Sequence, residues 1–341
     1  MKKRILYIGN NLSNSTFTAT YISFFSEVLK QEGYWVKTAS DKDNKAVRLV
    51  DMLYLLWRNR RETDTVLIDT YGAQNFYYAY SIAKLCQQLQ IPYIPILHGG
   101  NLPGRLEDSP KMSRSLFGNS KLNVAPSQFL HDIFQQHGFT NTRIIPNSIT
   151  LSDYPFTERR EFRPRLLWVR RFQERYNPML AVLVYRELLK FYPRAELCMV
   201  GPEKDGSLKE CRAYAEEHDL PVMFTGKLSK RKWAELSTDY DFFINSTNID
   251  NTPISVIEAM ALGLPVISTD VGGMPFLIEN GVDGVLVPEK NAPAMVDAIV
   301  DLLEHQEKAH AMAVAANKKV QAFDWEVVKE EWIGVLDSDE Y

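Results

Sequence analysis

Short apolar runs alternate with segments of helical periodicity along the whole chain. In residues 1–150 the helical segments lie near 17–31, 47–60, 76–90 and 127–137. The apolar runs around them are RILYIG, WVKTAS, TVLID, PYIPIL, LNVAP and RIIPN. This alternation is typical of βαβ units and predicts a parallel sheet with helices on its faces.

The same alternation starts again after a stretch without periodicity. The second series contains the runs RLLWV, AELCMVG, VMFTG, DFFIN, LPVIST and GVLVP, with helical segments between them. We therefore expect an α/β protein of two doubly wound, Rossmann-like domains, with ligands bound in a cleft at the carboxyl ends of the strands. The expected boundaries are 1–150 for the first domain, 151–164 for a linker, 165–320 for the second domain and 321–341 for a C-terminal helix that crosses back to the first.

Composition narrows the class of protein. A chain of 341 residues with 45% hydrophobic content buries large cores, and we expect neither a signal peptide nor a membrane-spanning helix. Cys86, Cys198 and Cys211 are far apart and lack metal-ligand spacing, so we expect reduced thiols, a cytoplasmic location and no metal site. Basic residues outnumber acidic ones only in residues 1–150. They suit an anionic membrane or a phosphorylated acceptor better than nucleic acid, which has no matching motif here.

Two acids flank a predicted helix start in NIDNTPISVIEAMALGLPVISTDVGG. We expect Thr252 to cap this helix and Pro253 to occupy its first turn, which leaves backbone N–H groups for a phosphate. Glu258 then lies where a carboxylate can accept both hydroxyls of a ribose, and Asp250 can reach a sugar on the far phosphate. A solvated helix acid and an ordinary turn residue are the alternatives.

A basic loop, VRRFQERYNP, follows a predicted strand and precedes a helix that we expect Asn177 to cap and Pro178 to start. Arg171 and Arg175 are placed there at the carboxyl edge of the sheet. Their guanidinium groups can stabilise the negative charge of a diphosphate leaving group. The alternative is a basic surface loop.

Two further strand ends carry weaker signals. GNNLSN begins with Gly9, but the Gly-x-Gly-x-x-Gly spacing of dinucleotide enzymes is absent. ILHGGNLPGR ends a strand with His98 before two glycines, so the ring is expected to donate to a sugar hydroxyl or a phosphate. A structural histidine is the alternative. Apolar and basic residues also combine at 52–61 and around Lys111 and Arg114, where a membrane or a lipid-linked acceptor can be contacted. For 52–61, an ordinary half-buried helix with a solvated basic end is the alternative.

Together these motifs resemble the retaining glycosyltransferases of family 4, which have the GT-B fold. DNTPISVIEAMALGLPVISTDVGG resembles the family's paired-acid segment, and VRRFQERYNP resembles its donor-phosphate loop. The first half of the chain resembles the family more loosely, and its best matches are HGGNLPGR and VAPSQFL. Three positions depart from the pattern: Arg170 replaces the usual glycine, Arg175 a lysine and Asp250 a glutamate.

The resemblance implies metal-independent transfer of a hexose, with retention, from a UDP- or GDP-linked sugar to a glycan or lipid-linked acceptor. The first domain would face the acceptor and the second the donor, and no cofactor is expected. A nucleotide-sugar epimerase of the same fold and a catalytically silent sugar-binding protein are the alternatives.

The expected site residues fall into three groups. The catalytic group is His98, Arg171, Arg175, Asp250 and Glu258. The donor-binding group is Gly9, Asn10, Gly201, Gly226, Lys227, Leu228, Asn251, Thr252, Pro253, Ile254 and Ser255. The acceptor-side group is Asn101, Arg105, Lys111 and Arg114.

Overall fold

The computed structural model describes residues 2–11 and 21–338 and divides the chain into two compact units. The first unit consists of Met1–Pro146 with Val328–Tyr341, and the second of Asn147–Val327. Each unit holds one six-stranded sheet, and every strand pairing within it is parallel. The α/β class and the two doubly wound sheets expected from the sequence are confirmed.

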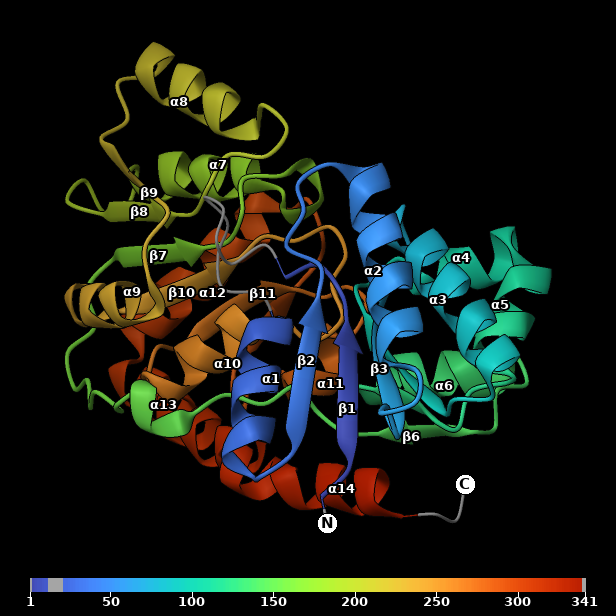
Figure 1. Cartoon of the computed structure of the whole chain (residues 1–341). Helices are drawn as coiled ribbons and strands as arrows, with labels where there is room; N and C mark the ends of the chain where they lie inside the picture. Colours follow the sequence, from blue (N-terminus) through green and yellow to red (C-terminus); the bar gives the residue numbers. More distant parts are fainter. Residues whose placement is uncertain (1, 12–20, 339–341) are drawn as a thin grey trace. The chain divides into compact units, whose positions relative to one another are not determined.

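The sheet of the first unit has the order β2-β1-β3-β4-β5-β6 (Figure 1). Its strands are β1 (Arg4–Ile8), β2 (Trp35–Ala39), β3 (Thr65–Tyr71), β4 (Tyr93–His98), β5 (Asn123–Ala125) and β6 (Thr142–Ile144). Its helices are α1 (Tyr21–Gln31), α2 (Lys45–Asn59), α3 (Asn75–Leu89), α4 (Leu102–Asp108), α5 (Pro110–Phe117) and α6 (Gln128–Gln136). Buried aliphatic and aromatic side chains of β1–β5 and of α2–α6 belong to one core cluster.

Helix α14 (Trp325–Asp337) runs across the boundary between the units, and most of it clusters with the first. Its Trp332 ring lies 4.5 Å from the ring of Phe25, centroid to centroid, and is fully buried. Asp337 accepts hydrogen bonds from Lys2 and from the hydroxyl of Tyr34. The C-terminal helix thus covers part of the core of the first unit.

The sheet of the second unit has the order β12-β11-β10-β7-β8-β9. Its strands are β7 (Arg165–Val169), β8 (Glu196–Val200), β9 (Val222–Gly226), β10 (Phe242–Asn245), β11 (Val266–Thr269) and β12 (Val285–Val287). Along β7, Leu166 and Trp168 enter one core cluster and Leu167 enters another, because successive side chains of a strand face opposite sides. The sheet is therefore covered on both faces.

The helices of the second unit lie between these strands and after them (Figure 1). They are α7 (Pro178–Leu188), α8 (Ser207–Glu217), α9 (Lys230–Leu236), α10 (Ile254–Ala261), α11 (Met274–Leu277), α12 (Ala292–Glu304) and α13 (Gln306–Val320). Short 3-10 helices occur at Leu151–Asp153, Glu174–Tyr176, Ser237–Asp239 and Gln321–Phe323. Asn177 caps α7 through a hydrogen bond from the Leu180 N–H, and Pro178 occupies its first turn, as the sequence predicts.

Residues 151–164, expected as a linker, are packed into the second unit. Arg159 in this segment is buried and donates five hydrogen bonds to the backbone carbonyl oxygens of Thr157, Ser237, Tyr240, Leu262 and Gly263. The buried rings of Tyr154 and Phe162 add apolar contacts. The segment has no hydrophobic periodicity, so the sequence suggested a linker, but contacts of single residues hold it against the second unit.

Candidate active site in the second unit

The loops that follow β7 and β10 are joined by hydrogen bonds. The hydroxyl of Ser246 donates to the carbonyl oxygens of Tyr176, at 3.0 Å, and Asn177, at 2.8 Å. The backbone N–H of Asn248 donates to the carbonyl oxygen of Arg175 at 2.9 Å. Because the two strands are neighbours in a parallel sheet, both loops leave the same edge. The basic loop and the acidic loop are therefore held against each other.

Three arginines gather at this edge. Arg170 forms an ion pair with Asp250, and its guanidinium carbon lies 4.6 Å from the centre of the Tyr176 ring. The guanidinium carbon of Arg175 lies 5.4 Å from the same ring. Burial lowers the pKa of Arg170, and the charges of Arg175 and Arg171 lower it further. The site thus concentrates positive charge at a largely buried position.

Much of the hydrogen-bonding capacity of these arginines is unused. The Nε atoms of Arg170 and Arg175 are buried and have no hydrogen-bond partner. No ion pair joins Arg171 or Arg175 to an acid among residues 2–11 and 21–338. A buried donor without an acceptor is costly, so this arrangement suits an anion with several oxygens.

Asp250, expected to reach a sugar, has both carboxylate oxygens engaged. Oδ2 is bound by Arg170, and Oδ1 accepts the N–H of Asn251 at 2.9 Å. The glycines of the DVGG segment explain the position of this loop. A Cβ atom at Gly272 would overlap the carbonyl oxygen of Asp250, and one at Gly273 would overlap that of Asn251. These two glycines therefore allow backbone to pack against backbone.

The start of α10 differs from the prediction by one residue. Pro253, rather than Thr252, is the N-cap residue, and no side chain caps the helix. Pro253 has an extended backbone and cannot be part of the first turn, since its ψ is 119°. Thr252 is buried, and its carbonyl oxygen accepts a hydrogen bond from Asn147. The Oγ of Ser255 is also buried without a partner.

Glu258 lies within α10 and is only 4% exposed. Its Oε1 accepts a hydrogen bond from the Tyr154 hydroxyl at 2.5 Å and forms an ion pair with Lys230 at 3.2 Å. Burial and the charge of Glu258 raise the pKa of Tyr154 well above its usual range, so this hydroxyl stays protonated and donates. One oxygen of Glu258 is thus held in place, and the other is left for a ligand.

The positions expected near a nucleobase lie at the ends of β8 and β9. The N–H of Gly201 donates to the carbonyl oxygen of Gly226 at 2.9 Å. A Cβ atom at Gly201 would overlap the Arg170 carbonyl oxygen, so this glycine is needed for packing at the end of β7. Lys227 is exposed and Leu228 packs at the edge of a core cluster.

Candidate site residues in the first unit

His98 ends β4 and is 7% exposed. Its Nε2 lies 2.8 Å from Oδ1 of Asp69, and the Tyr7 hydroxyl donates to the same oxygen at 2.7 Å. The ring of Tyr71 stacks on the imidazole at 5.0 Å, centroid to centroid. Burial, together with the Asp69 charge, raises the pKa of Tyr7. One imidazole nitrogen is therefore committed to Asp69, and only Nδ1 remains for a substrate.

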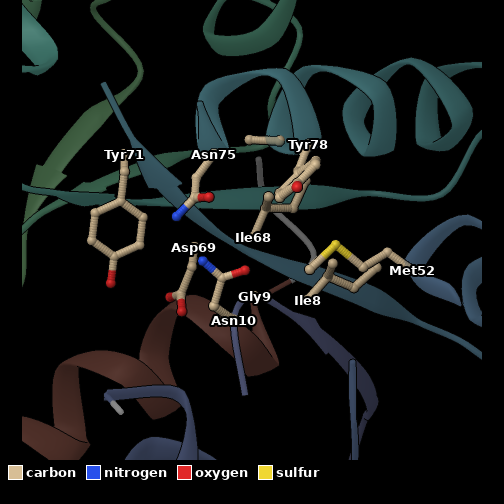
Figure 2. A pocket seen from close by; sticks show the side chains of 10 residues that line it. Ile8, Gly9, Asn10, Met52, Ile68, Asp69, Tyr71, Asn75 and Tyr78 are labelled. Atoms are coloured by element: carbon tan, nitrogen blue, oxygen red, sulfur yellow. The ribbon is translucent and has the colours of Figure 1, made fainter. Parts of the chain in front are cut away.

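A small pocket is lined in part by Asp69 (Figure 2). Its wall contains Gly9 and Asn10, which the sequence assigned to the donor, and both lie at the end of β1. Figure 2 shows Asp69, Asn10 and Asn75 around the polar part of this pocket. A Cβ atom at Gly9 would overlap Oδ2 of Asp69, which explains the glycine. Residues 12–14 of the GNNLSN segment lie outside the described residues.

The four residues expected on the acceptor side do not form one cluster of contacts. Arg105 is used within the fold: its Nε donates to the carbonyl oxygen of Gly72 at 2.8 Å, and its guanidinium lies over Phe76. Asn101 precedes α4 without a capping hydrogen bond from its side chain. Lys111 and Arg114 are exposed on α5. Only these last two present free surface charge.

Sequence reasoning missed four residues that the structure brings into these sites: Tyr7, Asp69, Tyr154 and Lys230. Asp69 had a detectable signal, since it is an acid near the carboxyl end of the apolar run TVLID. Tyr154 and Lys230 had none, because they meet Glu258 from distant parts of the chain.

Two structural features are absent from residues 2–11 and 21–338. No group of three or more His, Cys, Asp and Glu side chains is arranged to hold a metal ion. No helix in this part of the chain has the length and apolar character needed to span a membrane.

Similarity to known proteins

The sequence of the second unit matches a known family. Residues 154–319 match the model of the family described as Glycosyl transferases group 1. The amylovoran biosynthesis glycosyltransferase AmsK of Erwinia amylovora is 24% identical over 324 residues, covering 82% of this chain and 79% of that enzyme. The phosphatidyl-myo-inositol mannosyltransferase of Mycobacterium tuberculosis is 24% identical over 204 residues, covering 57% of this chain and 53% of that enzyme.

Solved structures show the same fold over nearly the whole chain. HepE of Anabaena, in complex with UDP and glucose, has a TM-score of 0.78 at 17% identity and covers 98% of this chain and 99% of its own. Sucrose-phosphate synthase of Thermosynechococcus elongatus has a TM-score of 0.82 at 17% identity and covers 98% of both chains. These neighbours have the GT-B fold that the sequence predicts. Residues 154–319 thus match the glycosyl transferases of group 1, and the protein is a glycosyltransferase.

Proposed function

We propose that the enzyme transfers a hexose from a nucleotide diphosphate sugar to a hydroxyl of a glycan or lipid-linked acceptor, with retention and without a metal ion. One observation carries the donor assignment: Arg171 and Arg175 form no ion pair with an acid among the described residues. Both belong to the loop after β7, which is hydrogen-bonded to the loop that leads into α10. Two unbalanced cations beside an uncapped helix start favour a ligand with two negative charges.

The donor is held by three kinds of contact in this proposal. Arg171 and Arg175 bind the diphosphate with charge-assisted hydrogen bonds, and the backbone amides of Ile254 and Ser255 at the start of α10 add to them. Glu258 accepts ribose hydroxyls through Oε2, since Oε1 is bound by Tyr154 and Lys230. The complexes of HepE with UDP and UDP-glucose support a uridine nucleotide as the first candidate, with backbone of residues 226–228 near the base.

The chemical step follows from these roles. The bond between the anomeric carbon and the diphosphate oxygen breaks, and the acceptor oxygen forms a bond to the same face of the sugar. The acceptor proton passes to the departing phosphate oxygen, whose negative charge the arginines stabilise. His98 orients the sugar through Nδ1, because Asp69 occupies Nε2. No metal ion takes part in this scheme.

The acceptor-side unit also has a surface that suits a membrane-bound acceptor. Val47, Val50, Tyr54 and Trp57 form a stripe along α2, and each is more than half exposed. Their spacing of three and four residues places them on one face of the helix. The guanidinium of Arg60 stacks on Trp57 at 4.3 Å. Together with exposed Arg58 and Arg61, this stripe combines apolar insertion with attraction to anionic headgroups. We infer peripheral contact with a cytoplasmic membrane face, where Lys111 and Arg114 on α5 assist acceptor binding.

Transfer is tested with Arg171→Ala and Glu258→Ala, with Arg194→Ala as a control. Calorimetry with UDP and GDP identifies the nucleotide, and product analysis with UDP- and GDP-hexoses follows hydrolysis and transfer. We expect each site variant to weaken nucleotide binding at least about tenfold, as the loss of a charged hydrogen bond does. Binding within about twofold of the wild type in both site variants would remove the donor assignment. Conversion of the donor into its epimer without sugar release would identify an epimerase instead.

Membrane contact is tested by sedimentation with vesicles of phosphatidylcholine, with and without phosphatidylglycerol. We expect binding only to the anionic vesicles and a loss of about tenfold in a Tyr54→Ser, Trp57→Ser double variant. Phe191→Ser, which changes an exposed aromatic residue of the second unit, is the control. Equal binding of the double variant and the control would contradict the proposal.

A further inference from the structure

Arg170 occupies a fixed position at the edge of the sheet, next to the arginines assigned to the diphosphate. Its backbone N–H donates to the carbonyl oxygen of Val200 at 3.0 Å. Its carbonyl oxygen lies where Gly201 has no side chain, so the backbone of Arg170 is pressed against β8. The direction of the Arg170 side chain is therefore set by the sheet.

The side chain of Arg170 is only partly satisfied by its surroundings. It is 14% exposed, forms its ion pair with Asp250 through Nη2, and packs over Tyr176. Its Nε is buried and has no partner, and the same holds for Nε of Arg175 on the same ring. A guanidinium group has five N–H donors, so Arg170 retains donors for a second anionic group.

Asp250 is the only acid that forms an ion pair with Arg170 among residues 2–11 and 21–338. The carboxylate is 13% exposed, and its second oxygen already accepts the N–H of Asn251. Its backbone carbonyl lies against Gly272 and accepts a hydrogen bond from the N–H of Gly273 at 3.0 Å, which holds the Asp250 backbone in place. Asp250 is therefore placed to act on Arg170.

We propose that Arg170 is a third arginine for the donor diphosphate and that Asp250 competes with the diphosphate for it. This inference rests on the donor site proposed above. When the site is empty, the Asp250 carboxylate balances the Arg170 charge. When a diphosphate enters, its oxygens accept from the free donors of Arg170, and the nearby Asp250 charge opposes the added negative charge. Asp250 thereby weakens the hold on the diphosphate and favours release of the nucleotide product.

The test measures the binding of inorganic pyrophosphate, UDP and UDP-glucose by calorimetry to Arg170→Gln, Asp250→Asn and the double variant. We expect Arg170→Gln to weaken pyrophosphate binding about 10- to 100-fold, because charged hydrogen bonds are lost. We expect Asp250→Asn to strengthen it by roughly threefold to tenfold, because a nearby negative charge is removed. Within each variant, the affinities for pyrophosphate, UDP and UDP-glucose should change by the same factor. In the Arg170→Gln background, the Asp250→Asn change should have a smaller effect.

The double variant keeps the test valid if Arg170→Gln does not fold, because it leaves no unpaired buried carboxylate. It should fold and still bind pyrophosphate more weakly than the wild type. Wild-type affinity for pyrophosphate in the double variant would overturn the role of Arg170. A loss of UDP-glucose binding in Asp250→Asn, with pyrophosphate binding unchanged, would instead make Asp250 a sugar ligand. Arg171→Ala and Glu258→Ala distinguish the proposed donor site from the proposed role of Arg170. The donor site is contradicted only if these two variants bind UDP as tightly as the wild type.

Discussion

The hydrogen bond between Tyr154 and Glu258 allows a quantitative test of the candidate site in the second unit. Tyr154→Phe removes one hydroxyl and keeps the ring, whose centroid lies 6.2 Å from that of Trp233. Glu258 is 4% exposed, so water does not readily replace the lost donor. A hydrogen bond to a buried charge contributes about 1.5–3 kcal/mol to stability. Lys230 still pairs with Oε1 and offsets part of the loss, so we expect the free energy of unfolding to fall by about 2 kcal/mol.

The assay is urea unfolding followed by tryptophan fluorescence, since Trp168 and Trp233 are both buried in the second unit. The Tyr154→Phe variant should also bind the nucleotide more weakly, because Glu258 loses one of the two groups that orient it. Tyr77→Phe is the control: its side chain is 48% exposed, and its stability should change by less than about 0.5 kcal/mol.

The pH dependence of this effect has a definite sign. The pKa of Tyr154 is raised in the folded protein, so its stabilising contribution is complete below the unfolded pKa of about 10 and is lost as the pH rises above it. The difference between variant and wild type should therefore be constant from about pH 7 to 9. A Tyr154→Phe, Glu258→Gln double variant should show non-additive losses, because the two groups interact directly. Additive losses, or a single-variant loss below about 0.5 kcal/mol, would refute the reasoning.

Three further predictions follow from packing and burial. Arg159→Met should lower the free energy of unfolding by more than about 4 kcal/mol, because five backbone carbonyls lose their donor, and should expose residues 151–164 to limited proteolysis; unchanged cleavage would contradict this. Gly272→Ala should destabilise the protein by about 2 kcal/mol or more in urea unfolding, whereas Gly281→Ala, which has open space around it, should cost only about 1 kcal/mol; equal costs would count against the packing argument. Burial raises the pKa of Cys86 and of Cys211 to about 12, so stability should be full below about pH 8.5 and fall as the pH rises towards 12. A Cys86→Ala, Cys211→Ala variant should show a flatter profile above that pH in the same measurement.

The elements of the two sheets were predictable because their apolar runs are short, clearly bounded and separated by helical periods. Each of the twelve runs named from the sequence contains or overlaps a strand of the structure. Helices α4, α5 and α11 were missed because they are at most eight residues long and contain Pro, Gly or Ser, which favour turns. Local composition is a weak guide where a helix has only one or two turns.

The candidate site was predictable only where its parts follow strands in sequence. Arg171, Arg175 and Glu258 come from segments next to strand ends, so the parallel topology alone brings them to one edge of the sheet. Their partners could not be predicted. Tyr154 reaches Glu258 across 104 positions of sequence, and Arg170 reaches Asp250 across 80. The sequence pattern predicts where the backbone segments lie. It does not predict which side chains pair, because pairing depends on packing between segments that are distant in sequence.

The hydrogen bonds from Ser246 and Asn248 to the loop after β7 have a consequence for protein engineering. Residues 170–178 and 246–253 form one hydrogen-bonded unit, because Ser246 and Asn248 donate to carbonyl oxygens of residues 175–177 and the Asn177 side chain donates to that of Asn248. If only one of the two segments came from a related transferase, the hydroxyl and amide donors of one segment would no longer meet the carbonyl oxygens that accept from them here. A chimera that is meant to change donor preference should therefore carry both segments from the same parent.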